Sequence, residues 1–208
     1  MHEARPVQRE YDRLAETYDR RWARYVERTV ALTLEDVQPA PGMRLLDVGC
    51  GSGVLLERLR ARCPGAQLHG LDLSSGMLER ARQRLGDDVE LAEGRAAELP
   101  WPDNSFDGVI SSSMFHYLRN PVAALREWRR VVRPGGCVRV VDWCRDYWTV
   151  AALDQWLRRV EDAHFRAWRS RELAAMLREA GLPPTRIQRR RIDWFWGMMA
   201  ATVHKAPA

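Results

Sequence analysis

Three glycines at alternate positions form the part of the sequence best suited to holding a ligand against the backbone. Leu45–Val48 has strand character, and a helical pattern begins at Val54. Glycines at 49, 51 and 53 permit positive φ and remove side chains, so backbone N–H groups can approach a ligand. A P-loop is excluded because it needs Gly-Lys-Ser or Gly-Lys-Thr where Gly53 is followed by Val54. The dinucleotide pattern G-x-G-x-x-G is weakened, since it requires glycine at position 54.

An acidic residue about twenty positions further on supplies a second ligand group. Gln67–Leu73 is expected to be a short strand with Asp72 close to its C-terminal end. A carboxylate at this place can accept hydrogen bonds from both ribose hydroxyls of a nucleoside. The alternative is that Asp72 only caps the helix that follows Ser74 and Ser75.

Three blocks of sequence together resemble the class I S-adenosylmethionine (SAM) dependent methyltransferases. They are Leu46–Gly53, Leu71–Ser74 and Leu99–Asp107. The small-molecule branch that includes the quinone-biosynthesis C-methyltransferases is the most similar, and the resemblance covers roughly residues 8 to 145. It implies an α/β fold, a Rossmann-like three-layer sandwich whose seven-stranded sheet is mostly parallel and ends in an antiparallel hairpin. The implied cofactor is SAM.

The resemblance also implies which residues contact the cofactor. Asp72 would anchor the ribose, and Asp47 would support the glycine loop and the methionine end of SAM. Leu73 and Met77 would border the adenine, although apolar residues there are also typical of plain core. The full expected set is Tyr11, Tyr18, Asp47, Gly49, Cys50, Gly51, Gly53, Asp72, Leu73, Met77, Ala96 and Ser111.

Two parts of this set depend on open alternatives. Tyr11 and Tyr18 lie in an N-terminal segment that reaches over the cofactor in similar proteins, but both could simply pack a short helix onto the domain. The chain has Gly-Arg-Ala at 94–96 where relatives commonly carry Gly-Asp-Ala, and Arg95 cannot accept a hydrogen bond. The adenine would then be held by backbone groups at Ala96 and by stacking, or by Glu98.

The segment after the fourth expected strand, Phe106–Ile110, borders the methyl-transfer site in the fold that the chain resembles. It reads Ser-Ser-Ser-Met-Phe-His from residue 111, without the Asn or Asp, Pro-Pro and aromatic pattern of nucleic-acid amino-methyltransferases. We therefore expect no nucleic-acid acceptor. His116 is the one obvious titratable group here, and it is either a general base or a structural histidine.

Aromatic residues become frequent from Trp143 onward, which favours an apolar or aromatic acceptor, the alternative being a cationic acceptor attracted to the faces of the rings. The candidate acceptor contacts are Phe115, His116, Trp143, Tyr147 and Trp148. We expect Trp156, Trp168 and Trp194 to be ordinary packing residues.

The elements that must position these residues fit one domain over residues 1–208. Residues 1–38 would form a helical lid segment, 39–145 the cofactor-binding core, and 146–208 the substrate-side helices and final hairpin. Gly135 and Gly136 are expected in a turn before a strand at 138–142, and Ser170 is expected to cap a helix. The final strands are expected at about 185 to 192 and 195 to 203.

Composition and cysteine spacing bear on the partners, metals and location that we expect. The net charge is +5, but the arginines are scattered beside acidic residues, and the block Arg189–Arg191 falls in an expected edge strand. The cysteines at 50, 63, 137 and 144 form no C-x-x-C pair, so we expect reduced thiols and no metal. Without a long apolar run or a signal-like N-terminus, we expect a cytoplasmic protein with no membrane span.

The predicted function is methyl transfer from SAM to a small-molecule acceptor by direct in-line displacement. That reaction depends mainly on close, collinear positioning, which agrees with the lack of a convincing catalytic pair. A SAM-binding sensor or complex subunit without turnover is the alternative from another class. An NAD-dependent oxidoreductase is disfavoured by Val54 and by the absence of a Tyr-x-x-x-Lys pair.

Overall fold

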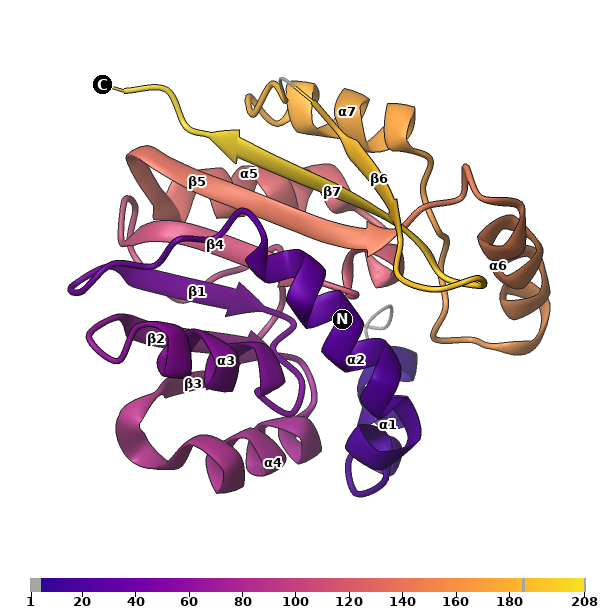
Figure 1. Cartoon of the computed structure of the whole chain (residues 1–208), viewed down its shortest axis with the longest axis horizontal. Coiled ribbons are helices and arrows are strands. Elements are labelled where there is room, and N and C mark those ends of the chain that lie inside the picture. The colour runs from indigo at the N-terminus through magenta and orange to yellow at the C-terminus, as the bar shows by residue number, and fades with distance from the viewer. Residues whose placement is uncertain (1–4, 185, 208) are drawn as a thin grey trace.

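A computed structural model describes residues 5–184 and 186–207. A seven-stranded sheet in the order β3-β2-β1-β4-β5-β7-β6 runs through these residues. Strands β3, β2, β1, β4 and β5 are parallel, and β7 is antiparallel to both β5 and β6. The sheet, with helices on both faces, is the predicted Rossmann-like sandwich (Figure 1). The strands are β1 (Arg44–Val48), β2 (Gln67–Asp72), β3 (Glu90–Glu93), β4 (Phe106–Ser112), β5 (Val132–Trp143), β6 (Gln188–Arg191) and β7 (Gly197–His204).

Helices α3, α4 and α5 connect β1 to β2, β2 to β3 and β4 to β5, and such crossover connections allow the strands to run in the same direction. Two short 3₁₀ turns, Gly86–Asp88 and Phe115–Tyr117, complete the described elements. No helix among the described residues is long and apolar enough to cross a membrane. The helices are α1 (Arg5–Leu14), α2 (Tyr18–Leu34), α3 (Val54–Arg62), α4 (Ser75–Leu85), α5 (Pro121–Val131), α6 (Trp148–Val160) and α7 (Ser170–Glu179).

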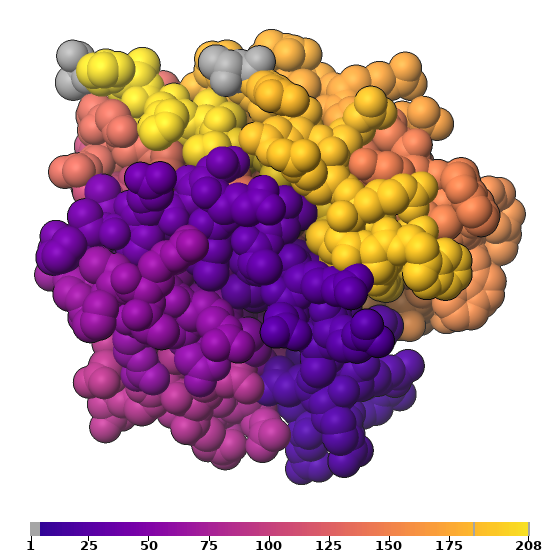
Figure 2. Space-filling model, in the orientation of Figure 1, coloured from indigo at the N-terminus to yellow at the C-terminus, as the bar shows by residue number. Residues whose placement is uncertain are grey.

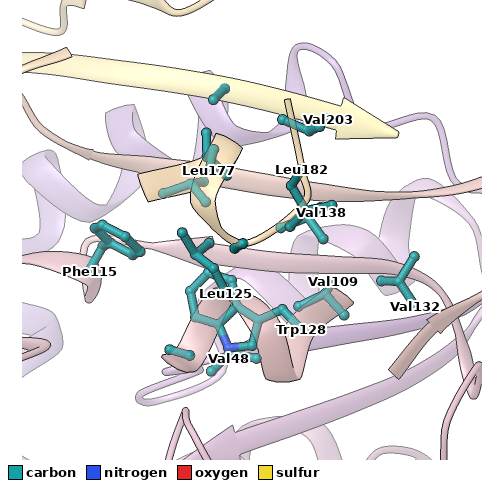
Figure 3. Close-up of a cluster of buried hydrophobic side chains, with 14 of the residues drawn as sticks. Val48, Val109, Phe115, Leu125, Trp128, Val132, Val138, Leu177, Leu182 and Val203 are labelled. Atoms are coloured by element: carbon teal, nitrogen blue, oxygen red, sulfur yellow. The ribbon is translucent and has the colours of Figure 1, made fainter. Parts of the chain in front are cut away.

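Two apolar clusters lie on opposite faces of the sheet. Side chains of one strand alternate between the faces, so the neighbours Leu45 and Leu46 belong to different clusters. The larger cluster joins the central strands to α5 and α7, with Trp128 and Leu125 at its centre (Figure 3). The other joins the sheet to α2, α3 and α4. Both faces of β1 are therefore covered, which holds the loop at its C-terminal end.

Several element boundaries differ from the sequence-based prediction. Strand β5 begins at Val132, before Gly135 and Gly136, because the backbone there pairs with the neighbouring strand β4 across a register shift. Helix α7 begins at Ser170 with Arg169 as its cap, so the predicted Ser170 cap was wrong. The Ser170 hydroxyl instead donates to Asp146 Oδ2 at 2.5 Å. Thr185, the first residue of one predicted strand, lies outside the described residues, as do residues 1–4 and 208.

Candidate cofactor and acceptor site

The glycine loop leaves the C-terminal end of β1 in a conformation that only glycine adopts easily. Gly49, Gly51 and Gly53 have φ of 80°, 52° and 81°. The N–H groups of Gly49 and Cys50 both donate to the Leu71 carbonyl, at 2.7 and 3.1 Å, which ties the loop to β2. The loop therefore borders the sheet edge where ligands bind in open α/β folds.

A cavity of about 210 Å³ lies against this loop, and the three glycines relate to it differently. Gly49 and Gly51 line the cavity, whereas Gly53 does not. A Cβ on Gly53 would lie 2.9 Å from Leu85 Cδ1 and 3.2 Å from Ala81 Cβ. Gly53 thus permits close packing of α3 on α4, and its role is in the fold.

Asp72 lines the same cavity and also organises the loop. Its Oδ2 accepts the Gly51 N–H at 2.8 Å, and its Oδ1 accepts the Ser74 N–H at 2.9 Å. Burial raises the pKa of Asp72, and these backbone hydrogen bonds oppose that shift. Each carboxylate oxygen keeps a further lone pair, so the group can still accept hydrogen bonds from a ligand.

Asp47 borders a second, smaller cavity of about 70 Å³ that shares Tyr18, Gly49 and Gly51 with the first. The residue is 2% exposed, and its Oδ1 has no hydrogen-bond partner among the described residues. Burial, helped by the nearby charge of Asp72, raises the pKa of Asp47 to about 8. A buried carboxylate that lines a cavity and has one unpartnered oxygen fits a cationic ligand group, such as the ammonium of an amino acid.

The N-terminal helices close one side of both cavities. The Tyr11 hydroxyl donates to the Tyr117 hydroxyl at 2.8 Å, and the Tyr11 and Tyr18 rings lie 5.7 Å apart. Tyr11, Tyr18 and Tyr117 all line the larger cavity. The structure thus places both predicted lid tyrosines where a bound ligand would meet them.

Polar side chains fasten these helices to the loop and to α4. Asp12 accepts the Ser74 hydroxyl at 2.5 Å and the Gly76 N–H at 3.1 Å. Asp19 accepts the Ser52 hydroxyl at 2.5 Å and pairs with Arg84 at 2.6 Å. Helix α1 buries none of its residues, so such polar contacts are an important part of what holds it in place.

The predicted adenine end is lined by residues 94–97 together with Leu73 and Met77. Arg95 and Ala96 both line the cavity, and the Ala96 carbonyl accepts the Trp128 indole N–H at 2.9 Å. Glu98 lies outside the lining, with a side chain that is 75% exposed and 3.9 Å from Arg95. Backbone groups are therefore better placed than Glu98 to meet a base.

After β4, the chain passes the cavity at Ser112, Ser113 and Met114. Ser113 has a positive φ of 56°, and Met114 packs so tightly on Gly49 that a Cβ there would lie 2.5 Å from Met114 Cγ. Ser111 does not line the cavity. The residue is 1% exposed, and its hydroxyl has no hydrogen-bond partner among the described residues. Cys50 lines only the smaller cavity.

His116 lies outside both cavities, in a buried stack of rings. Its Nδ1 is 2.8 Å from Asp142 Oδ1, and its ring stacks on Trp143 with centroids 4.0 Å apart. The Nε2 atom has no partner among the described residues, and the residue is 1% exposed. The structure does not bring His116 to the cavity walls.

The other predicted acceptor contacts also lie outside the two cavities. Phe115 is fully buried against Trp128, and Trp148 is 73% exposed. Tyr147 packs on Gly197, with Arg191 over its ring at 4.7 Å. Trp143 is linked to the site, because its indole N–H donates to the Tyr25 hydroxyl at 2.7 Å.

Two exposed tryptophans contradict the packing prediction. Trp156 is 58% exposed and Trp194 is 79% exposed, so neither belongs to the core as expected. Trp156 is on the exposed side of α6, and Trp194 is on the loop between β6 and β7.

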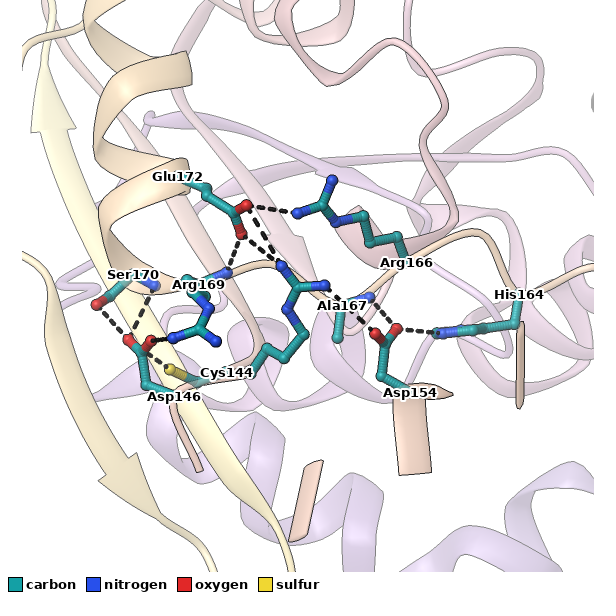
Figure 4. A network of polar contacts seen from close by, with 10 residues as sticks. Cys144, Asp146, Asp154, His164, Arg166, Ala167, Arg169, Ser170 and Glu172 are labelled. Atoms are coloured by element: carbon teal, nitrogen blue, oxygen red, sulfur yellow. Dashed lines mark hydrogen bonds and ion pairs between the residues drawn. The ribbon is translucent and has the colours of Figure 1, made fainter. Parts of the chain in front are cut away.

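A polar network fixes the segment between α6 and α7 behind the ring stack. Glu172 accepts from Arg166 at 2.5 Å and from Arg145 at 3.3 Å (Figure 4). Asp154 pairs with His164 Nε2 at 2.8 Å and accepts the Ala167 N–H at 2.6 Å. His164 lies 5.7 Å from His116 between ring centroids. These contacts hold the ring stack in one arrangement.

Sequence reasoning missed Tyr25 and Tyr117. The Tyr25 hydroxyl lies 2.6 Å from Ser113 Oγ, and Tyr117 receives the Tyr11 hydrogen bond. The seven-residue spacing of Tyr18 and Tyr25 in a helix was a usable signal, because it puts both rings on one face. The Tyr11–Tyr117 contact had no local signal.

Comparison with known proteins agrees with this geometry. Residues 46–140 match the model of a methyltransferase domain family. The chain is 39% identical over 142 residues to the malonyl-[acyl-carrier protein] O-methyltransferase of Geobacter sulfurreducens, covering 65% of this chain and 52% of that protein. It is 35% identical over 141 residues to the demethylmenaquinone methyltransferase of Symbiobacterium thermophilum, covering 61% and 54%. The chain therefore spans about half the length of these two curated relatives.

A solved structure shows the same fold over nearly the whole chain. It is the complex between the Haloferax volcanii Trm112 methyltransferase activator and the putative methyltransferase, in which one chain aligns with a TM-score of 0.83 and 24% identity. The alignment covers 96% of this chain and 98% of that one. The chain thus matches a methyltransferase domain in sequence over residues 46–140, and over nearly its whole length it has the fold of that solved chain.

Proposed function

We propose that the protein transfers a methyl group from SAM to a small-molecule acceptor. The observation that carries the proposal is the continuous site at the C-terminal ends of β1, β2 and β4. There the Gly49 and Gly51 backbone, the Asp72 carboxylate and the buried Asp47 carboxylate face two adjoining cavities. In the proposed complex the glycine backbone lies against an uncharged part of SAM. Asp72 faces its ribose hydroxyls, and Asp47 faces its cationic ammonium.

The ribose, the ammonium and the adenine of the cofactor each have a candidate partner. Asp72 accepts hydrogen bonds from the ribose, and Asp47 lies beside the ammonium of the methionine end. Leu73 and Met77 contact the adenine, whose polar edge is left to the backbone around Ala96. Tyr11 and Tyr18 cover the bound molecule from the N-terminal side and reduce its contact with water.

When bound, the cofactor would supply an electrophilic methyl group on its sulfonium; the acceptor atom would form a bond to the methyl carbon as the C–S bond breaks, and the electron pair of that bond would leave on the sulfur of S-adenosylhomocysteine. The role of the protein is then to hold the acceptor close and in line, an effect that can contribute on the order of 7 kcal/mol or more. Ser112, Ser113 and Met114 border the space where this alignment takes place. His116 is buried beside Asp142, so a general-base role for it requires the ring stack to open.

The test is a calorimetric titration with SAM, S-adenosylhomocysteine and NAD in parallel. The proposal expects binding of both sulfur nucleosides and none of NAD, and NAD binding alone would overturn it. Asp72→Asn should weaken the binding of S-adenosylhomocysteine by about 1.5 to 3 kcal/mol, because a charge-assisted hydrogen bond is lost. The matched control is Asp87→Asn, which alters an exposed carboxylate after α4 and should leave affinity unchanged.

Methyl transfer itself needs an acceptor screen. Turnover of any small molecule with release of S-adenosylhomocysteine would support the enzyme. Tight cofactor binding with persistent failure across acceptor classes would favour a binding protein without turnover.

A further inference from the structure

A groove outside the cofactor site is bordered by the N-terminal half of α2 and by the loop between β6 and β7. Its volume is about 650 Å³, within the range of small-molecule sites. Figure 2 shows the two segments side by side on the surface, the helix in indigo and the loop in yellow. The basic side chains that line it are Arg20, Arg21, Arg24 and Arg28.

The charge of the groove is only partly balanced. Asp193 is the acidic residue among its lining residues, and it lies 3.8 Å from Arg28. Arg21 is positioned over the Trp22 ring at 5.5 Å. Within the part of the chain that the structure describes, Arg20 and Arg24 form no ion pair and no side-chain hydrogen bond. Two guanidinium groups are therefore available to an anion.

The position of these arginines on the helix runs against local preference. Helix α2 begins at Tyr18, so Arg20 and Arg21 lie in its first turn. The N-terminal end of a helix carries the positive end of its dipole, where cationic side chains are unfavourable. Such departures from local preference are expected where a binding function requires them.

Aromatic rings form the rest of the groove and lead to the cofactor site. The Tyr25 and Trp196 rings lie 4.8 Å apart, and Trp196 lies 4.9 Å from Trp143. Trp194 stands 79% exposed at the rim. Flat apolar surface beside unpaired guanidinium groups suits a planar anion.

Tyr25 is the link between groove and cavity. It lines the groove and also the smaller cavity at the glycine loop. Its hydroxyl lies 2.6 Å from Ser113 Oγ, and Ser113 lines the cofactor cavity. A molecule in the groove is thus separated from the cofactor site by one aromatic side chain.

We propose that this groove binds the anionic, planar end of the methyl acceptor. The acceptor class would be aromatic or conjugated compounds that bear a carboxylate or a phosphate. Arg20 and Arg24 would bind the anionic group, since guanidinium matches both anions with paired hydrogen bonds. The role of the bound molecule as acceptor rests on the proposed methyltransferase function, whereas its binding in the groove does not.

The test measures binding of 2-naphthoate, 2-naphthyl phosphate and the uncharged 2-naphthylmethanol by calorimetry and tryptophan fluorescence. In the wild type, at least one of the anions should bind at least tenfold more tightly than the alcohol, and more weakly as salt rises. The variant R20Q/R24Q should lose at least tenfold in affinity for that anion only. The control R171Q/R178Q removes two exposed arginines from α7 and should behave as the wild type. The ratio between the two anions identifies the preferred group.

Several results would overturn the inference. These are equal binding of the alcohol and both anions, or unchanged anion affinity in R20Q/R24Q. Tighter binding of a short single-stranded oligonucleotide than of either naphthyl anion, lost in R20Q/R24Q, would assign the groove to nucleic acid instead. S-adenosylhomocysteine is titrated into every variant, and its affinity should not change. Failure of that ligand to bind the wild type would count against the methyltransferase proposal alone, because the groove measurement uses no cofactor.

Discussion

Replacing Asp47 by Asn should change how the stability of the protein depends on pH. The carboxyl has an ordinary pKa of 3.8 and a pKa of about 8 in the folded protein, because burial disfavours its charge. Between these values the folded state binds one proton more than the unfolded state. Stability from this group is therefore fully present below pH 3.8 and is lost as the pH rises towards 8.

The size of the effect follows from the shift. One pKa unit corresponds to about 1.4 kcal/mol, so the wild type should lose about 2 kcal/mol relative to Asp47→Asn between pH 6 and pH 8. Asp72 titrates in both proteins, so its contribution largely cancels in the difference. Urea denaturation of the two proteins at each pH measures that difference directly. The Asp87→Asn variant should follow the wild-type curve, since that carboxylate is exposed.

The same substitution tests the proposed contact with the methionine end of SAM. A cation beside Asp47 favours the charged carboxylate, so cofactor binding below pH 8 should release a proton from the wild type and not from Asp47→Asn. Calorimetry in buffers of different ionisation enthalpy detects that proton. Parallel stability curves for the wild type and the variant would refute the burial argument, and binding without proton release would refute the contact.

The glycine loop and the lid allow three further tests. Gly51→Ala should lower the free energy of unfolding by about 1 to 2 kcal/mol, because residue 51 has a positive φ. It should also weaken the binding of S-adenosylhomocysteine, because residue 51 lines the cavity. Thermal unfolding measures the first effect and calorimetry the second. Gly53→Ala should lower the free energy of unfolding further, by about 2 to 4 kcal/mol, because its Cβ also meets Leu85 and Ala81; equal stability of the two variants would contradict the packing role. Tyr117→Phe removes the Tyr11 hydrogen bond and should raise the dissociation rate of S-adenosylhomocysteine in stopped-flow measurements severalfold, with little change in stability; an unchanged rate would argue against a lid.

The sequence was most informative where the site is built from neighbouring residues. The strand, loop and helix around Gly49 and Gly51 are local, and the periodicity of the flanking segments sufficed to predict them. The resemblance to the methyltransferase family implied the mostly parallel sheet, and β6 (Gln188–Arg191) is the edge strand expected for its arginines. The fold class was therefore predictable before any coordinates.

Long-range contacts were beyond the reach of that reasoning. Nothing in the local sequence indicated the partners of Asp12 and Asp19, which reach Ser74 and Ser52 across more than thirty positions of sequence. The expected Ser170 cap failed because a tertiary partner, Asp146, took its hydroxyl. Trp194 was assigned to packing because size and apolarity usually lead to burial, and its place at a hairpin tip reverses that. The spacing of residues in the sequence does not show where a tertiary partner overrides a local preference.

Because α1 is attached by polar contacts, its local stability should depend on whether a ligand occupies the cavity beside it. A helix without buried residues contributes little to the cooperative core, so its amides should exchange with solvent through local opening. A ligand beneath Tyr11 would add to the few apolar contacts that α1 makes on its own. The deuterium uptake of residues 5–14, or the rate at which a protease cuts there, would then report whether the cavity beside Tyr11 is filled, without any label on the ligand.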